Sequence, residues 1–150
     1  MRFEICGEEV FDIIKDCREK HFPELSGCNI TAIFDAKKRL KDGKITLASI
    51  QKPNELMKFF TIEDSGSSEG YDYVIRIDSK CWHTVATPEE KIKIIRHELN
   101  HTNVDFDSNT PYKLCGHDIE DFVVEVERNA DDPRWRDRIA ESTCAEYDRE

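Results

Sequence analysis

The chain has 150 residues and is acidic, because 22 Lys and Arg face 32 Asp and Glu, which leaves a formal net charge of −10 at pH 7. Hydrophobic residues make up 38% of the sequence, which is enough for one small core, so the length predicts a single domain over residues 1–150. The acidic balance argues against direct binding to DNA or RNA, since phosphate binding needs a concentrated basic surface.

Neither a membrane span nor a secretion signal is evident in the sequence. No apolar stretch approaches the roughly 20 residues that cross a bilayer. The N-terminus lacks a basic segment followed by an apolar run and a small-residue cleavage site, so we expect a cytoplasmic location. The six cysteines include no CxxC pair, which excludes a zinc ribbon, and we expect them to be reduced.

The first half of the chain predicts a helix followed by strands. Apolar residues recur at helical spacing over residues 8–20. Residues 29–35 and 44–51 predict two strands, separated by a basic stretch that ends in Asp42-Gly43. Residues 54–60 predict a short helix, and residues 63–70, which are rich in Gly and Ser, predict a mobile loop.

Residues 71–78 predict a half-buried strand, because Tyr73, Ile75 and Ile77 would share one face of an extended chain and mostly charged side chains the other. One hypothesis makes this strand, which directly precedes the best-marked helix, an edge strand that pairs with an extended peptide substrate. The alternative is a core strand. After the helix, residues 105–115 are expected to be irregular, and residues 118–128 and 132–148 predict two further helices.

The best-marked helix begins after Thr87. Thr87 provides a capping side chain, Pro88 takes the first helical position and Glu90 lies three residues after the cap, a combination typical of a helix start. We expect the helix to run to about residue 103. Its buried stripe would consist of Ile92, Ile95 and Leu99.

Residues 97–101 of this helix, His-Glu-Leu-Asn-His, form an HExxH motif. Imidazoles four residues apart lie one above the other on a helix, at the spacing that holds one Zn²⁺ from two corners of a tetrahedron. Glu98 is about a quarter turn from His97, where its carboxylate can reach a water beside the metal and act as general base. The motif therefore predicts a zinc site with His97 and His101 as ligands.

A catalytic zinc site needs a third protein ligand. His117 follows the motif after a turn-forming stretch long enough to return the chain to the metal, whereas His21 and His83 are more typical of surface or interface histidines. If His117 is not the ligand, Glu120 or Glu125 would complete the site. Three acids are candidates for hydrogen bonds to a ligand's second ring nitrogen: Asp118, Glu120 and Asp121.

The residues after the motif separate subclasses of zinc hydrolase. Val104 stands where the metzincin pattern HExxHxxGxxH requires glycine, and the glycine-rich segment with the cysteine ligand of peptide deformylases is missing. Segments 96–101, Arg-His-Glu-Leu-Asn-His, and 114–122, Leu-Cys-Gly-His-Asp-Ile-Glu-Asp-Phe, resemble the family of putative phage metallopeptidases, which is related in layout to SprT-like zincins. The resemblance covers about residues 71–147.

Membership of that family implies a zincin-like α+β fold, in which a small mixed sheet packs on the HExxH helix and further C-terminal helices follow. It also implies His97, His101 and His117 as zinc ligands and Glu98 as base. SprT-like proteins often append a cysteine zinc ribbon for DNA attachment, and its absence from this sequence weakens a DNA-repair protease interpretation.

We therefore expect a zinc-dependent hydrolase, most simply a metallopeptidase acting on a peptide or protein substrate, with Glu98 taking the proton of the attacking water. Hydrolysis of a non-peptide amide uses the same chemistry and stays open, as does the oligomeric state. The alternative is a catalytically silent zincin-fold interaction or inhibitor module with structural zinc. Candidates for the oxyanion-stabilising residue are Tyr71, Tyr73, Tyr112 and Tyr147. Trp82 and Trp135 are expected in the core.

Overall fold

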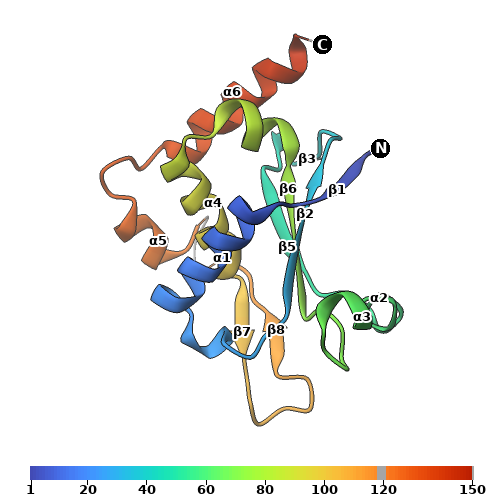
Figure 1. The fold of residues 1–150 in the computed structure, drawn as a ribbon. Helices are drawn as coiled ribbons and strands as arrows, with labels where there is room; N and C mark the ends of the chain where they lie inside the picture. The colour runs from blue at the N-terminus through green and yellow to red at the C-terminus, as the bar shows by residue number, and fades with distance from the viewer. Residues whose placement is uncertain (118–120, 150) are drawn as a thin grey trace.

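A four-stranded mixed sheet, in the order β1-β2-β6-β5, organises the molecule (Figure 1). The computed structural model describes residues 1–117 and 121–149. The strands of the sheet are β1 (Phe3–Ile5), β2 (Ile30–Asp35), β5 (Ala48–Gln51) and β6 (Tyr73–Asp78). Strands β2 and β6 are parallel, whereas β1 and β5 each run antiparallel to their neighbour. The predicted α+β class with a small mixed sheet is confirmed.

Helices α1 and α4 lie side by side against one face of this sheet, and α5 and α6 lie on the same side of it (Figure 1). The helical elements are α1 (Glu8–His21), η1 (Pro23–Leu25), α2 (Glu55–Phe60), α3 (Ile62–Ser65), η2 (Cys81–Val85), α4 (Pro88–Leu99), α5 (Val123–Arg128) and α6 (Trp135–Asp148). Two hairpins complete the fold: β3 (Leu40–Lys41) with β4 (Lys44–Ile45), and β7 (Thr102–Val104) with β8 (Tyr112–Leu114). Among these described helices, none combines the length and apolar character needed to span a bilayer.

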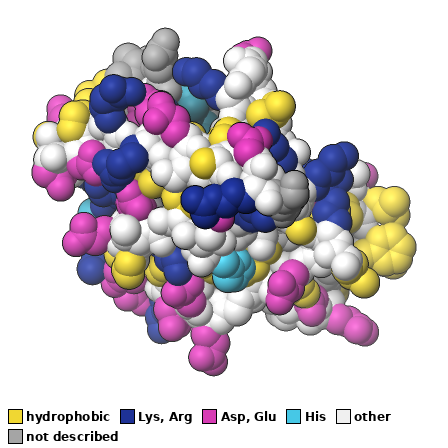
Figure 2. All heavy atoms as spheres, turned by 90° about the horizontal axis from the view of Figure 1, so that it is seen from above, with side chains coloured by type: hydrophobic (Ala, Val, Ile, Leu, Met, Phe, Trp, Pro, Cys, Tyr) yellow, Lys and Arg dark blue, Asp and Glu magenta, His cyan; other side chains and the backbone are white. Residues whose placement is uncertain are grey.

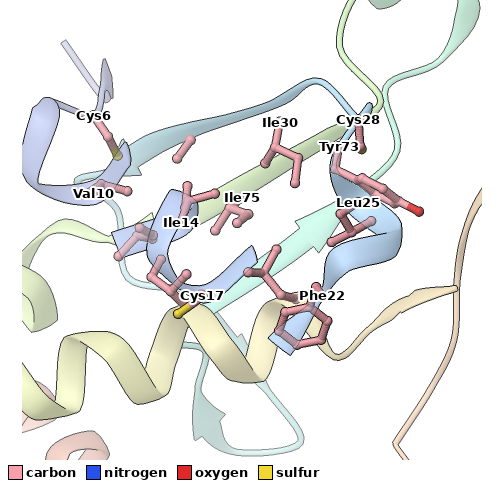
Figure 3. Close-up of a cluster of buried hydrophobic side chains, with 14 of the residues drawn as sticks. Cys6, Val10, Ile14, Cys17, Phe22, Leu25, Cys28, Ile30, Tyr73 and Ile75 are labelled. Atoms are coloured by element: carbon pink, nitrogen blue, oxygen red, sulfur yellow. The ribbon is translucent and has the colours of Figure 1, made fainter. Parts of the chain in front are cut away.

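The main core lies between the sheet and the two helices α1 and α4. Val10, Ile14 and Cys17 of α1 point toward Ile75 at the centre of the sheet (Figure 3). From α4, the buried side chains of Ile95 and Leu99 join the same cluster. Burying an aliphatic side chain of this size stabilises the fold by about 1.5–3 kcal/mol, so this packing holds α4 firmly against the sheet.

A second cluster attaches α6 to the other side of α4. Ile94 of α4 packs with Trp135 and Ile139 of α6 and with Ile45 and Leu47 from the chain around β4. Trp82, in η2, belongs to the main core and is 1% exposed, so both tryptophans lie in the core as expected. No disulfide joins any of the six cysteines, all of which are described, and Cys6, Cys17, Cys28 and Cys81 are buried.

The strand predicted over residues 71–78 forms as β6, but the edge-strand hypothesis for it is wrong. β6 pairs with β2 on one side and β5 on the other, so it is an interior strand with no free backbone edge. The core-strand alternative is therefore the correct one. The edge strand on this side of the sheet is β5, which also contacts α4.

Several predicted boundaries needed correction. The strand expected over residues 44–51 divides into β4 and β5, because β4 turns back on β3 through Asp42 and Gly43, which both have positive φ. Residues 63–65 of the expected loop belong to α3, and β8 lies within the segment expected to be irregular. In α4, Ile92 was expected to be buried but is exposed, and Ile94 is buried instead.

Candidate metal site

The site is built on the C-terminal end of α4. The capping box expected at its start is present, since Thr87 Oγ1 accepts from the Glu90 amide and Glu90 Oε1 accepts from the Thr87 amide. The helix ends at Leu99 rather than near residue 103, so His101 lies in the turn that follows it. The rings of His97 and His101 are nevertheless neighbours, with centroids 5.4 Å apart.

The β7–β8 hairpin returns the chain to this turn. The Cys115 amide donates to the His101 carbonyl oxygen at 2.6 Å, and His101 Nδ1 donates to the Cys115 carbonyl oxygen at 2.8 Å. Two residues further on, His117 lies against both other rings, and its Nε2 is 3.1 Å from His97 Nε2. One possible ligand atom from each of these three histidines lies within 4.8 Å of the other two.

Hydrogen bonds and packing fix the orientation of the rings. His97 Nδ1 is 2.9 Å from Asp121 Oδ1, while His101 Nδ1 is held by Cys115, so Nε2 of each ring is left to face the centre of the group. Phe122 packs edge-on against all three rings, at 4.9–5.3 Å between centroids. Of the three acids expected to bond to the second ring nitrogen of a ligand, Asp121 lies beside His97 in this way. The other two, Asp118 and Glu120, lie outside the described residues.

This donor set fits a zinc ion. Ligands held about 2.0–2.1 Å from zinc at tetrahedral angles are about 3.3 Å from each other, close to the 3.1 Å between His97 Nε2 and His117 Nε2. Burial, together with the neighbouring His97, His101 and Arg136, lowers the pKa of His117 to about 4, so its ring is neutral at physiological pH, as a metal ligand must be. Three imidazoles also leave a coordination position open, as in catalytic sites.

Glu98 differs from every other buried carboxylate of the described chain. It is 6% exposed, and within residues 1–117 and 121–149 no hydrogen bond or ion pair reaches its carboxylate. The others each have a partner: Asp35 with Arg76, Asp72 with Lys58, Asp78 with Tyr147, Glu90 with Arg138, and Glu125 with Arg96. Burial raises the pKa of Glu98, against the opposing effect of His97 and His101.

The other candidates from the sequence have partners elsewhere or are not part of the three-histidine group. The Glu125 carboxylate is held by Arg96 at 2.8 Å and by Asn100 at 2.9 Å, so it joins α5 to α4 and is not one of the grouped ligands. The four candidate tyrosines are engaged elsewhere: the hydroxyl groups of Tyr71, Tyr73 and Tyr147 donate to Asp64, Lys113 and Asp78, and Tyr112 packs on Tyr73. His21 and His83 are not part of the group.

Sequence reasoning missed one residue at the site. Arg136, in the first turn of α6, places its Nη1 atom 3.2 Å from His97 Nδ1 and 3.3 Å from His97 Nε2. No motif marks an arginine at this position, because a surface helix carries such residues routinely. The one available signal was the buried Trp135 beside it, which fixes the rotation of α6.

Fold and site together define an α+β protein with a three-histidine group that could hold a metal ion. The chain belongs to the family described as putative phage metallopeptidase, whose family model matches residues 2–143. No curated protein and no solved structure matches the chain.

Proposed function

We propose that the protein is a zinc-dependent hydrolase with a zincin-like fold, and most simply a peptidase. The observation that carries this proposal is the Glu98 carboxylate, which is buried beside the three histidines and has no partner among the described residues. A mostly buried carboxylate that no described group holds is available to take a proton from a water beside the metal, whereas a purely structural metal site would not need one. This favours catalysis over the silent interaction module.

His97, His101 and His117 would hold the ion, which when bound polarises the scissile carbonyl group and lowers the pKa of the attacking water. Glu98 accepts one proton from that water while the hydroxyl oxygen bonds to the carbonyl carbon. The same carboxylic acid then donates the proton to the amide nitrogen as the C–N bond breaks, so the products are a carboxylic acid and an amine. The raised pKa of Glu98 suits both transfers, because it makes the carboxylate a stronger base than an exposed one.

For the substrate, we propose an extended peptide that pairs with β5. Among the described strands, β5 is an outer strand of its sheet; it lies antiparallel to β6 and contacts α4, which carries His97 and Glu98. An extended chain added to a sheet edge gains backbone hydrogen bonds and is held straight, which presents one of its peptide bonds to the groups beside the strand.

The test is peptide cleavage by the zinc-loaded protein and by its Glu98→Gln variant, using a mixed peptide library read by mass spectrometry. We expect the wild type to cleave peptides, a chelator to stop cleavage and added zinc to restore it. Glu98→Gln should keep its zinc but lose about 10²–10⁴-fold in turnover. Glu89→Gln, an exposed change in the same helix, is the matched control and should remain active.

Equal turnover by Glu98→Gln would remove the assigned base and with it the proposal. A wild-type protein that binds one zinc ion but cleaves no peptide would favour the silent interaction module. The melting temperature of each variant shows whether that variant is folded, so a loss of activity caused by unfolding can be recognised.

A further inference from the structure

The sheet face opposite α1 and α4 carries a group of arginines. Ile50 and Ile75, which are paired in the sheet, belong to the main core, so the neighbouring pair of Ser49 and Arg76 projects from the opposite face. Arg39 reaches this pair from the segment between β2 and β3, and its Nη1 atom donates to Ser49 Oγ at 2.9 Å. Guanidinium groups therefore lie over β5 and β6 on this face.

The positive charges of this group outnumber the acid that holds them. Arg2, Arg39 and Arg76 are 2.8, 3.6 and 2.5 Å from the same carboxylate, that of Asp35. Three positive charges thus face one negative charge, and burial together with the neighbouring Arg76 lowers the pKa of Arg39. The side chains of Arg2 and Arg39 are 40% and 21% exposed, so an anion in the solvent can approach this surplus of positive charge.

Lysines extend the positive charge along β5. Residues 37–52 contain six Lys or Arg and a single acid, Asp42, in a chain whose formal net charge is −10. Lys41 and Lys44 are exposed and lie directly opposite each other in the β3–β4 hairpin, just before β5, and Lys52 directly follows β5. Like charges in such a pair destabilise a hairpin, which points to a role other than stability. In Figure 2, Lys and Arg side chains are visible on the right of the molecule, the side on which Figure 1 places β3.

This basic surface lies beside the strand with which the proposed peptide substrate pairs. In an added strand, the residue opposite Ser49 has its side chain on the same face as Ser49, with the two Cβ atoms about 4.5–5.5 Å apart. The residues two positions before and after it share that face. These substrate side chains would therefore lie next to Arg39 and toward the lysines, whereas the alternate ones point to the face that carries α4.

We propose that this surface selects peptide substrates with acidic side chains, and that Arg39, Lys41 and Lys44 determine this specificity. The proposal rests on the proposed hydrolytic function and names the chemical class of its substrate: an extended peptide with Asp or Glu at alternate positions, including the position opposite Ser49. A peptide is favoured over a nucleic acid as the anion, because a peptide can also pair with β5 through backbone hydrogen bonds and a phosphate backbone cannot.

The first test measures binding to the zinc-loaded Glu98→Gln variant, which should not cleave the probe. Two fluorescein-labelled peptides are compared by fluorescence anisotropy, one with Glu at alternate positions and one with Gln at the same positions. At about 0.05 M salt, the Glu peptide should bind about tenfold more tightly, since several exposed ion pairs each contribute a few-fold. At about 0.5 M salt, screening should reduce this preference to about twofold.

Substitutions in the same background locate the source of the preference. The double variant Lys41→Gln/Lys44→Gln and the single variant Arg39→Gln should each reduce it to about threefold or less. Arg39→Lys keeps the charge and should retain most of the preference. The matched control is Lys15→Gln/Lys20→Gln, which removes two exposed charges from α1 on the opposite side of the sheet and should keep it. Because removal of Lys41 and Lys44 relieves repulsion, the melting temperature of that variant should not fall.

The second test uses the same two peptides as substrates of the wild type, where the ratio of their kcat/KM values should follow the binding preference. If the wild type cleaves peptides without regard to acidic residues, or binds both peptides equally, the specificity is wrong and the hydrolase stands. A tenfold preference that survives both Lys41→Gln/Lys44→Gln and Arg39→Gln also overturns the proposal.

Two further outcomes separate this inference from its rivals. If single-stranded oligothymidylate binds more tightly than the Glu peptide and loses affinity in the same variants, the surface binds nucleic acid and the proposal is overturned. If the wild type cleaves nothing but the Glu peptide is bound selectively through Arg39, Lys41 and Lys44, the hydrolase fails and the surface for acidic peptides stands.

Discussion

Glu125 should be the residue whose charge holds α5 against α4. Its carboxylate is 1% exposed. It accepts from Arg96 Nε on α4 at 2.8 and 2.9 Å and from Asn100, directly after α4, at 2.9 Å. From its own segment it also accepts from Arg128 and Asn129. Glu125→Gln keeps the shape but leaves the Arg96 guanidinium, which is 14% exposed, without a counter-charge. Breaking a buried pair in this way costs about 3–5 kcal/mol of unfolding free energy.

Urea denaturation of the metal-free protein measures this change without a contribution from metal binding. With a slope of about 2 kcal/mol/M, a loss of 4 kcal/mol lowers the midpoint by about 2 M. Arg128→Gln is the control, because Arg128 makes one peripheral contact at 3.1 Å and its loss should cost about 1 kcal/mol or less. If Glu125→Gln unfolds at the same midpoint as Arg128→Gln, the reasoning about the buried pair is refuted.

Three further changes test other parts of the structure. Asp121→Asn removes the acceptor of His97 Nδ1 and should weaken zinc affinity about 10–100-fold, as measured by competition with a chromophoric chelator; unchanged affinity would contradict the orienting role. Burial tends to raise the pKa of Asp35, but hydrogen bonds from Arg2 and Arg76 outweigh it and hold the pKa well below its usual range. The stabilisation from Asp35 is therefore complete above about pH 4 and is lost as pH falls below that value, so Asp35→Asn should be less stable at pH 7 and lose less stability than the wild type between pH 4 and pH 2. Gly70→Ala should lower the free energy of unfolding by about 1–3 kcal/mol, because Gly70 has a φ of +72° and a methyl group would collide with the Lys58 carbonyl oxygen; an unchanged melting temperature would contradict this.

Features that depend on local chemistry could be predicted from the sequence. The Thr87–Glu90 capping box forms because both partners lie within one helical turn, and this fixes where α4 begins. The spacing of His97 and His101 brings their rings together, although α4 ends at Leu99. His117 could be selected because few histidines are available and a turn-forming stretch long enough to return the chain to the metal precedes it.

Features that depend on long-range contacts could not be predicted. Alternation in residues 71–78 indicates a strand but does not reveal its neighbours, and β5 covers the edge that was expected to be free. Similarly, nothing near Glu125 in the sequence shows that Arg96 is its partner. The position of Arg136 depends on how α6 packs against α4 through Ile94 and Trp135, and periodicity within α6 does not contain that information.

X-ray absorption at the zinc edge of the zinc-loaded protein tests the central claim most directly. We expect one zinc ion per chain, with three imidazole nitrogens and one oxygen at about 2.0–2.1 Å and no sulfur at about 2.3 Å. His117→Ala should then show one imidazole fewer. A sulfur ligand, a spectrum unchanged by His117→Ala, or zinc retained after His97 and His101 are both changed to Ala would contradict a site built by these three histidines.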